Sequence, residues 1–160
     1  MKTNACELVA LLSEKGLTFA SAESCTGGLI AKKITDISGC SSVFLGGVVS
    51  YANSVKENVL GVNAETLATV GAVSFETAKA MSEGVKALTG ADITAATTGI
   101  AGPGGGTDKK PVGTVFISVS YKENTKVVEN HFLGDRDEVR EQAAEKALLL
   151  ACDIIKEAIR

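Results

Sequence analysis

Short strand patterns alternate with amphipathic helical patterns along most of this chain, and this alternation is what most restricts its fold. Five segments are rich in apolar, β-branched or aromatic residues and are predicted to be strands: residues 17–23, 43–51, 93–98, 113–121 and 126–133. Helical patterns lie before, between and after them. The sequence therefore predicts an α/β fold, a single three-layer α/β/α domain over residues 1–160 with a mixed sheet of about five strands.

Several helix boundaries are indicated by capping residues. Gly16 and Gly90 each follow an apolar helical pattern and predict helix ends, because glycine readily takes the left-handed conformation found there. Asn53 and Ser74 are predicted to cap the starts of two further helices, because their side chains can accept bonds from the first backbone amides.

The last third of the chain predicts a hairpin and then a long helix. A short polar turn separates the last two strand patterns, which is typical of antiparallel neighbours. Asp135 and Glu138 have the spacing of a capping box, and an apolar stripe follows as far as Ala158. Within the second strand pattern, Gly46 and Gly47 predict a bend or bulge.

Charge and composition disfavour several classes of protein. The 16 basic and 19 acidic residues give a net charge of -3, and the basic residues are scattered, whereas nucleic-acid binding favours a basic stripe. No apolar run is long enough for a membrane span, and no signal peptide is evident, so a cytoplasmic protein is expected. Four separated cysteines and one histidine predict neither a metal site nor a disulfide scaffold, and no cofactor is expected.

Two glycine-rich segments follow predicted strands, where α/β proteins commonly bind ligands. The first segment, residues 24–28, reads Ser-Cys-Thr-Gly-Gly and could hold a phosphate at a helix start, or could be a purely structural turn. The second, residues 97–106, contains five glycines within eight residues and favours ligand binding over a mobile loop tip. Glu23, just before the first segment, either anchors the turn or contacts a ribose.

Lys56 is a candidate general base. The only histidine, His131, lies in a strand pattern, so a Ser-His-Asp triad is not supported and a serine nucleophile would need another base. A lysine can serve when burial or positive charge lowers its pKa, and Lys56 falls in the first turn of a predicted helix. The alternative is an ordinary solvated lysine.

Five motifs, in order, resemble the C-terminal domain family of the competence/damage-inducible protein CinA. They are Ala22-Glu23-Ser24-Cys25-Thr26-Gly27-Gly28, Gly39-x-Ser41-x-x-Phe44, Gly47-x-Val49-x-Tyr51-x-x-x-x-Lys56, Thr97-Thr98-Gly99-Ile100-Ala101-Gly102-Pro103-Gly104-Gly105, and Phe132-x-Gly134-Asp135-Arg136-x-x-Val139-Arg140. The resemblance covers nearly the whole chain. It implies an amidohydrolase that converts nicotinamide mononucleotide to nicotinic acid mononucleotide and ammonia.

The resemblance also implies roles for individual residues. Ser41 would be the nucleophile and Lys56 its base, while Tyr51 and Thr98 would orient the substrate or stabilise the oxyanion. The expected substrate-binding residues are Ser24, Thr26, Gly27, Gly28, Gly102, Gly104 and Gly105, with Arg136 or Arg140 at the phosphate. The expected partner is thus a small nucleotide, with no nucleic acid and no membrane.

The separation of Ser41 from Tyr51 is difficult to reconcile with one pocket. Ten extended residues span roughly 33 Å, so the strand between them must be short or bent, or a second subunit must complete the site. Together with the family resemblance, this favours a homodimer.

Two alternatives to a serine amidohydrolase remain open. Cys25 could be the nucleophile, because it lies between a strand and a helix start where a thiolate is stabilised. The chain could instead be a nucleotide-binding or partner-docking module without catalysis, which the glycine-rich segments would serve equally well.

Overall fold

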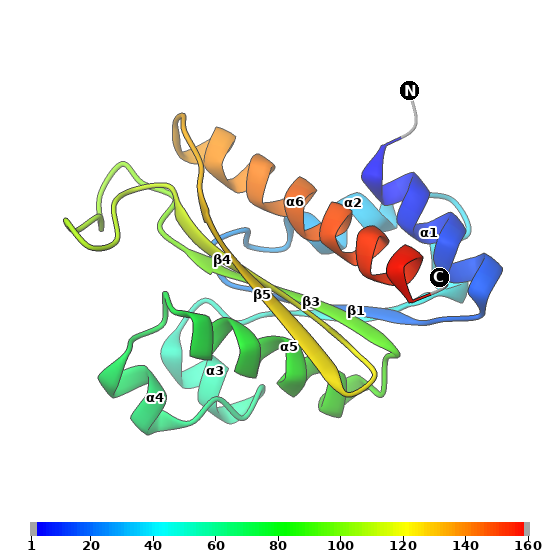
Figure 1. Cartoon of the computed structure of the whole chain (residues 1–160), viewed down its shortest axis with the longest axis horizontal. Coiled ribbons are helices and arrows are strands. Elements are labelled where there is room, and N and C mark those ends of the chain that lie inside the picture. Colours follow the sequence, from blue (N-terminus) through cyan, green and yellow to red (C-terminus); the bar gives the residue numbers. More distant parts are fainter. Residues whose placement is uncertain (1–2, 159–160) are drawn as a thin grey trace.

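A mixed five-stranded sheet lies between two layers of helices in the computed structural model, which describes residues 3–158 (Figure 1). The strand order is β2-β1-β3-β4-β5. The strands are β1 (Phe19–Glu23), β2 (Phe44–Val49), β3 (Ile93–Gly99), β4 (Thr114–Tyr121) and β5 (Asn124–His131). β1 is parallel to β2 and β3, whereas β4 is antiparallel to β3 and β5. The predicted α/β fold, with a mixed sheet covered by helices on both faces, is confirmed.

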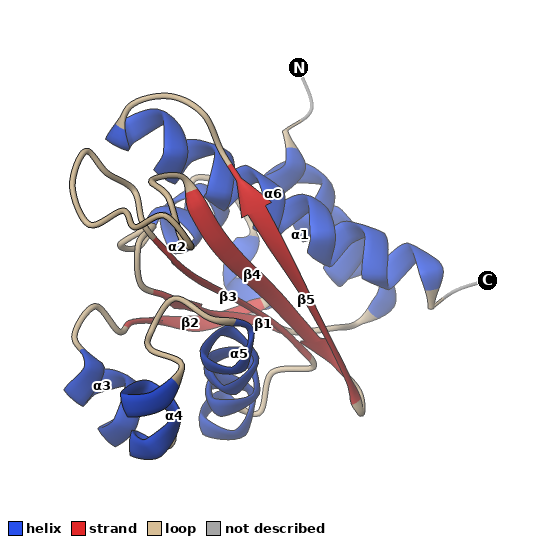
Figure 2. Cartoon of the chain, turned by 60° about the vertical axis from the view of Figure 1, so that its left-hand side comes forward, coloured by secondary structure: helices blue, strands red, loops and turns tan. Residues whose placement is uncertain are grey.

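The helices divide between the two faces of the sheet (Figure 2). One face carries α1 (Asn4–Lys15), α2 (Leu29–Thr35) and α6 (Arg136–Glu157), and the other carries α3 (Asn53–Asn58), α4 (Ala64–Thr69) and α5 (Phe75–Thr89). A 3-10 turn, η1 (Cys40–Ser42), precedes β2. Among the helices described, none combines the length and apolarity that crossing a bilayer requires.

Most of the predicted helix ends are confirmed. Gly16 and Gly90 have positive φ angles of 65° and 73° at the ends of α1 and α5. The Ser74 side chain accepts from the backbone amide of Thr77, as a helix cap should. At the start of α6, Asp135 and Glu138 form both bonds of a capping box.

The region between β2 and α5 differs from the prediction. The α3 helix begins at Asn53 itself, and Ala52 occupies the cap position without a side-chain bond, so the predicted Asn53 cap is wrong. The α4 helix, which Asn63 caps by accepting from the Glu65 amide, was not predicted because six residues give little periodic signal. The Asn53 side chain therefore does not cap α3.

The register of the parallel strands brings three chain segments together at one edge. Glu23 pairs with Val49 on one side and with Thr97 on the other, so the segments that follow these residues leave the sheet side by side. A shift in register near Ala20 and Gly46 produces the irregularity predicted at the glycines of β2. The predicted hairpin of β4 and β5 is also confirmed.

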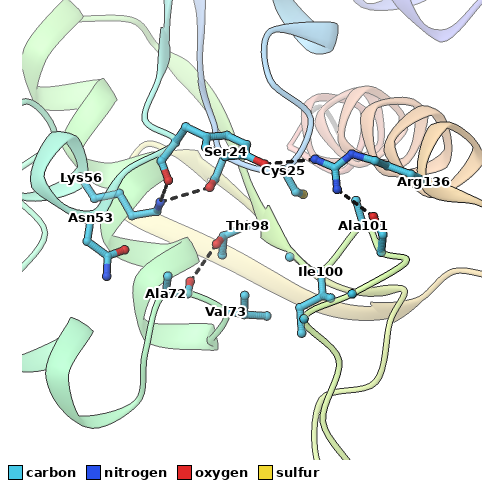
Figure 3. A pocket seen from close by; sticks show the side chains of 15 residues that line it. Ser24, Cys25, Asn53, Lys56, Ala72, Val73, Thr98, Ile100, Ala101 and Arg136 are labelled. Carbon is cyan, nitrogen blue, oxygen red and sulfur yellow. Dashed lines mark hydrogen bonds between the residues drawn. The ribbon is translucent and has the colours of Figure 1, made fainter.

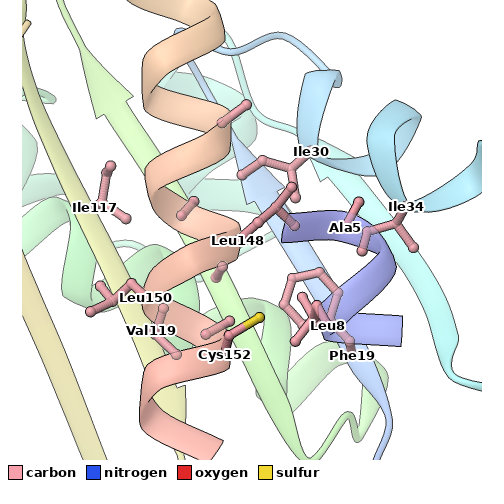
Figure 4. Close-up of a cluster of buried hydrophobic side chains, with 14 of the residues drawn as sticks. Ala5, Leu8, Phe19, Ile30, Ile34, Ile117, Val119, Leu148, Leu150 and Cys152 are labelled. Carbon is pink, nitrogen blue, oxygen red and sulfur yellow. The ribbon is translucent and has the colours of Figure 1, made fainter. Parts of the chain in front are cut away.

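The larger core lies between the sheet and the layer of α1, α2 and α6 (Figure 4). Leu148 of α6 and Leu8 of α1 are fully buried there, beside Phe19 and Ile117 of the sheet. A second, smaller cluster under α5 includes Met81. Burial on both faces makes the sheet a rigid base for the loops at its edge.

Leu148→Ala is expected to lower the free energy of unfolding by about 2–5 kcal/mol, because it removes a fully buried side chain and leaves a cavity. Leu133→Ala is the matched control, since Leu133 is 86% exposed and its loss should change stability by less than about 0.5 kcal/mol. Urea denaturation followed by circular dichroism measures both. Equal effects in the two variants would contradict the position assigned to α6.

Candidate functional site

A cavity of about 290 Å³ opens at the edge where β1, β2 and β3 end. It is lined by Ser24, Cys25, Tyr51, Asn53, Lys56, Ala72, Val73, Thr98, Gly99, Ile100, Ala101, Gly102, Gly104, Gly105 and Arg136. These residues come from the ends of three strands, from α3, from the loop before α5 and from the start of α6 (Figure 3). Across residues 3–158, no group of three or more His, Cys, Asp or Glu side chains is placed to hold a metal ion.

Lys56 is almost completely buried at one side of this cavity, with 1% of its surface exposed. Its Nζ lies 2.8 Å from the carbonyl oxygen of Ser50, 3.1 Å from that of Tyr51 and 3.1 Å from Ser24 Oγ. In the described part of the chain, no carboxylate forms an ion pair with it. The alternative of a solvated surface lysine is therefore excluded.

Burial lowers the pKa of Lys56 below the usual 10.5, and the nearby Cys25 opposes this only weakly. A neutral amine has two hydrogens and one lone pair. When the hydrogens point to the two backbone carbonyls, the lone pair faces Ser24 Oγ, so the amine can accept the hydroxyl proton. The geometry thus suits a Ser-Lys pair within one chain.

Ser24 is held rigidly because the turn around it is fixed by buried polar bonds. Its backbone amide donates to the carbonyl of Thr97 at 2.9 Å. The buried carboxylate of Glu23 accepts from the Thr26 hydroxyl at 2.7 Å, and from the backbone amides of Ile30 at 2.8 Å and Ala31 at 3.1 Å. Glu23 therefore anchors the turn, and of its two suggested roles this is the one the structure shows.

The start of α2 is poorly suited to bind a phosphate, although the first glycine-rich segment predicted one there. The amides of its first turn are occupied by Glu23, whose negative charge would also repel a phosphate. Thr26 is fully buried, and Gly27 and Gly28 do not line the cavity. Of this segment, Ser24 and Cys25 face the cavity.

Ser41 lies away from Lys56, so the predicted pairing of these two residues is corrected. Ser41 is exposed in η1, before β2, whereas Lys56 follows the end of that strand. The six residues of β2 separate them by about 20 Å, and within this chain it is Ser24 that meets the lysine. The distance argument for a second subunit concerned Ser41 and Tyr51, whereas the contact of Ser24 with Lys56 forms within one chain.

Arg136, and not Arg140, lines the cavity. Arg136 donates to the Gly102 carbonyl at 2.8 Å and to the Tyr51 hydroxyl at 3.1 Å. Arg140, one helical turn later, donates to the backbone carbonyls of Cys25 and Thr26 at 3.1 and 3.2 Å, so its role is to brace the Ser24 turn. Of the two arginines that the sequence offered, Arg136 is therefore the one at the cavity, and Arg140 supports the turn from behind it.

Thr98 lines the cavity, but its hydroxyl donates to the Ala72 carbonyl at 2.8 Å. Because a hydroxyl has one hydrogen, Thr98 as placed here can accept a bond from a ligand but cannot donate to an oxyanion. This bond argues against the predicted role of Thr98 in stabilising the oxyanion and is compatible with its predicted role in orienting the substrate.

The loop that contains the second glycine-rich segment is anchored at Lys110. Lys110 donates to the carbonyls of Val70 and Val73, which joins this loop to the segment before α5. Gly102 has a φ of 84°, and a Cβ there would lie 2.4 Å from a methyl group of Val112. Glycine at this position thus lets the loop pack closely against Val112.

Cys25 faces the cavity but is poorly suited to attack a substrate. Burial raises the pKa of its thiol to about 12, and the nearby Arg140 and Lys56 offset this only in part. The reactive thiolate is therefore a minor form at neutral pH. This argues against the alternative in which Cys25 is the nucleophile.

Asn53 and the segment Ala72–Val73 are cavity residues that the sequence did not reveal. The sequence predicts Asn53 as a helix cap, although its spacing of three from Lys56 places both on one helical face. The spacing of three residues could therefore have indicated that Asn53 lines the same site as Lys56. Ala72 and Val73 carry no such signal, because only the tertiary structure brings them to the cavity.

Comparison with known proteins identifies the family. A model of the CinA C-terminal domain matches residues 1–155. The chain belongs to the CinA family. Its curated relatives include a CinA-like protein of Geobacter sulfurreducens, 51% identical over 138 residues, which are 86% of this chain and 33% of the relative. The chain thus spans about a third of the length of that CinA protein.

Solved structures of the CinA superfamily have the same fold. The competence/damage inducible protein CihA from Agrobacterium tumefaciens is 41% identical with a TM-score of 0.90, covering 94% of this chain and 93% of that one. A CinA superfamily protein from Klebsiella pneumoniae 700603 is 34% identical with a TM-score of 0.93, covering 96% of both. These names refer to competence and damage and do not specify a reaction.

The amine of Lys56 is expected to titrate below 10.5, because burial favours its neutral form. NMR titration of lysines labelled at the side-chain nitrogen measures this, and Lys56→Met assigns the signal. The unfolded chain then holds this proton more tightly than the folded chain. Stability relative to Lys56→Met should therefore rise with pH between the folded pKa and 10.5. A signal that titrates at 10.5 or above contradicts this assignment.

Proposed function

We propose that this CinA domain hydrolyses the carboxamide of nicotinamide mononucleotide, with Ser24 as the nucleophile and Lys56 as the general base. The observation that supports this most is the buried Lys56 amine, whose lone pair faces Ser24 Oγ when the two carbonyls take its hydrogens. The substrate follows from the family resemblance, and the presence of a cation at the other side of the cavity agrees with it.

The reaction proceeds in two halves. Ser24 Oγ bonds to the carboxamide carbon while its proton passes to Lys56 Nζ, which gives a tetrahedral oxyanion. As the oxyanion collapses, the carbon–nitrogen bond breaks and Lys56 returns the proton to the departing ammonia. Water then attacks the acyl ester with Lys56 again taking a proton, and Ser24 Oγ leaves with that proton. The products are ammonia and the nicotinic acid nucleotide.

The surroundings of the pair suit a neutral amide substrate. Thr98 Oγ can accept a hydrogen bond from the carboxamide nitrogen, because its own hydrogen is committed to Ala72. The side-chain amide of Asn53 lines the cavity beside Lys56 and can donate to the oxyanion (Figure 3). The cationic pyridinium ring withdraws electrons from the carbonyl, which makes it easier to attack. Arg136 then meets the phosphate.

Ser24→Ala is expected to reduce kcat/KM for ammonia release from nicotinamide mononucleotide at least about a thousandfold, because the nucleophile is removed. Lys56→Met should have a similar effect. A coupled ammonia assay with purified protein measures this, and circular dichroism checks folding.

Ser41→Ala and Cys25→Ala serve as matched controls, one for an exposed serine and one for the adjacent cysteine. Loss of activity in Ser41→Ala with activity kept in Ser24→Ala would restore the pairing first suggested by the sequence. A wild-type protein that binds the nucleotide without releasing ammonia would favour a binding module over an enzyme.

A further inference from the structure

Four consecutive backbone carbonyls, those of residues 70–73 between α4 and α5, all accept hydrogen bonds from side chains. Lys110 donates to the first and the fourth, Thr77 to the second and Thr98 to the third. Within residues 3–158, none of these four carbonyls accepts from a backbone amide. Because backbone carbonyls away from water need partners, the position of this segment depends on these three side chains.

Lys110 is the donor that joins the 70–73 segment to the second glycine-rich loop. Its own backbone is held in a turn by two bonds to Thr107. The Thr107 amide donates to the Lys110 carbonyl at 2.8 Å, and the Lys110 amide donates to the Thr107 hydroxyl at 3.0 Å. Since the ammonium bonds the carbonyls at both ends of the segment, it fixes the two residues between them.

One of those two residues, Ala72, orients the hydroxyl of Thr98 (Figure 3). Both residues line the cavity, and the Thr98 hydroxyl donates to the Ala72 carbonyl at 2.8 Å. While its single hydrogen points to Ala72, the hydroxyl oxygen presents only lone pairs to a ligand. A carboxamide offers N–H donors to such an oxygen, whereas a carboxylate offers only further lone pairs.

The contact with Thr98 matters because little water reaches it. Thr98 is 1% exposed, so a carboxylate oxygen placed against its lone pairs would not be compensated by solvent. The wall formed by Ala72 and Thr98 therefore favours an amide over the corresponding acid.

We propose that Lys110 is a positioning residue that keeps the Thr98 hydroxyl an acceptor, so that the cavity binds a carboxamide in preference to the corresponding carboxylate. This inference rests on the proposed function and deepens it, because the two ligands are the substrate and the product of that reaction. Without the Lys110 bonds, the 70–73 segment loses two of its donors and the Ala72 carbonyl can move. The Thr98 hydrogen is then free to turn toward a carboxylate.

The test measures the affinities of nicotinamide mononucleotide and nicotinic acid mononucleotide by calorimetry, in a Ser24→Ala background chosen to prevent turnover. The amide should bind about tenfold more tightly than the acid, which is the contribution of one well-placed hydrogen bond. Adding Lys110→Met should lower this preference to about threefold or less, mainly because the acid gains affinity. Lys110→Arg keeps charged N–H donors and should retain most of the preference. Circular dichroism checks folding.

Lys109→Met is the matched control, because Lys109 is the neighbouring lysine, is exposed and does not line the cavity. It removes the same charge. Loss of positive charge alone would weaken binding of the more anionic acid and so raise the preference for the amide. A lower preference in Lys110→Met, with no decrease in Lys109→Met, therefore reports the orientation of Thr98 and not the loss of charge.

An unchanged or larger preference in Lys110→Met would overturn the inference. Equal losses of affinity for both ligands would overturn it too, because they would indicate a wall that is loosened without any change in selectivity.

These binding measurements separate the inference from the proposed reaction. A preference for the amide that Lys110→Met lowers supports the inference even if the wild type releases no ammonia. Equal affinities for amide and acid in the Ser24→Ala protein overturn it even if the wild type is an active amidase.

Discussion

The burial of the Lys56 amine without a carboxylate partner is the constraint on which the site depends. Taking a charged ammonium out of water is costly, and no ion pair in the described chain repays that cost. Two backbone carbonyls just beyond β2 hold the amine in place, and both can accept bonds from its neutral form. A lysine placed in this way is suited to accept a proton, whereas a structural lysine would be expected to pair with an acid.

The parallel strands explain why Ser24 is the residue opposite this amine. Glu23, Val49 and Thr97 are in register across β1, β2 and β3, so the next residues of all three strands emerge at the same edge. The glycine-rich turn that follows Ser24 serves mainly to hold that serine. Because the carboxylate of Glu23 takes the amides at the start of α2, the positive charge at the cavity comes from a side chain, that of Arg136.

Much of the fold could be predicted from local patterns, because helix capping and hydrophobic periodicity depend on interactions between neighbouring residues. The capping box at Asp135, the hairpin and the bend in β2 all depend on residues close in sequence. The site was harder to predict. Its residue types were evident, but Ser24 and Lys56 are 32 positions apart, and their contact depends on strand order and register. Ser41 is nearer in sequence to Lys56 and yet belongs to the other end of β2.

Arg136 and Tyr51 are two long side chains that the fold holds in place at the cavity. Long side chains lose conformational freedom on binding, and that loss weakens affinity unless the free protein has already ordered them. Here the Gly102 carbonyl and the Tyr51 hydroxyl hold the guanidinium in the cavity, and the backbone of Tyr51 is itself tied to Lys56. A ligand that reaches both sides therefore meets groups already in position. Because the backbone carbonyl of Tyr51 accepts from Lys56 and its hydroxyl accepts from Arg136, this one residue connects the two sides of the cavity.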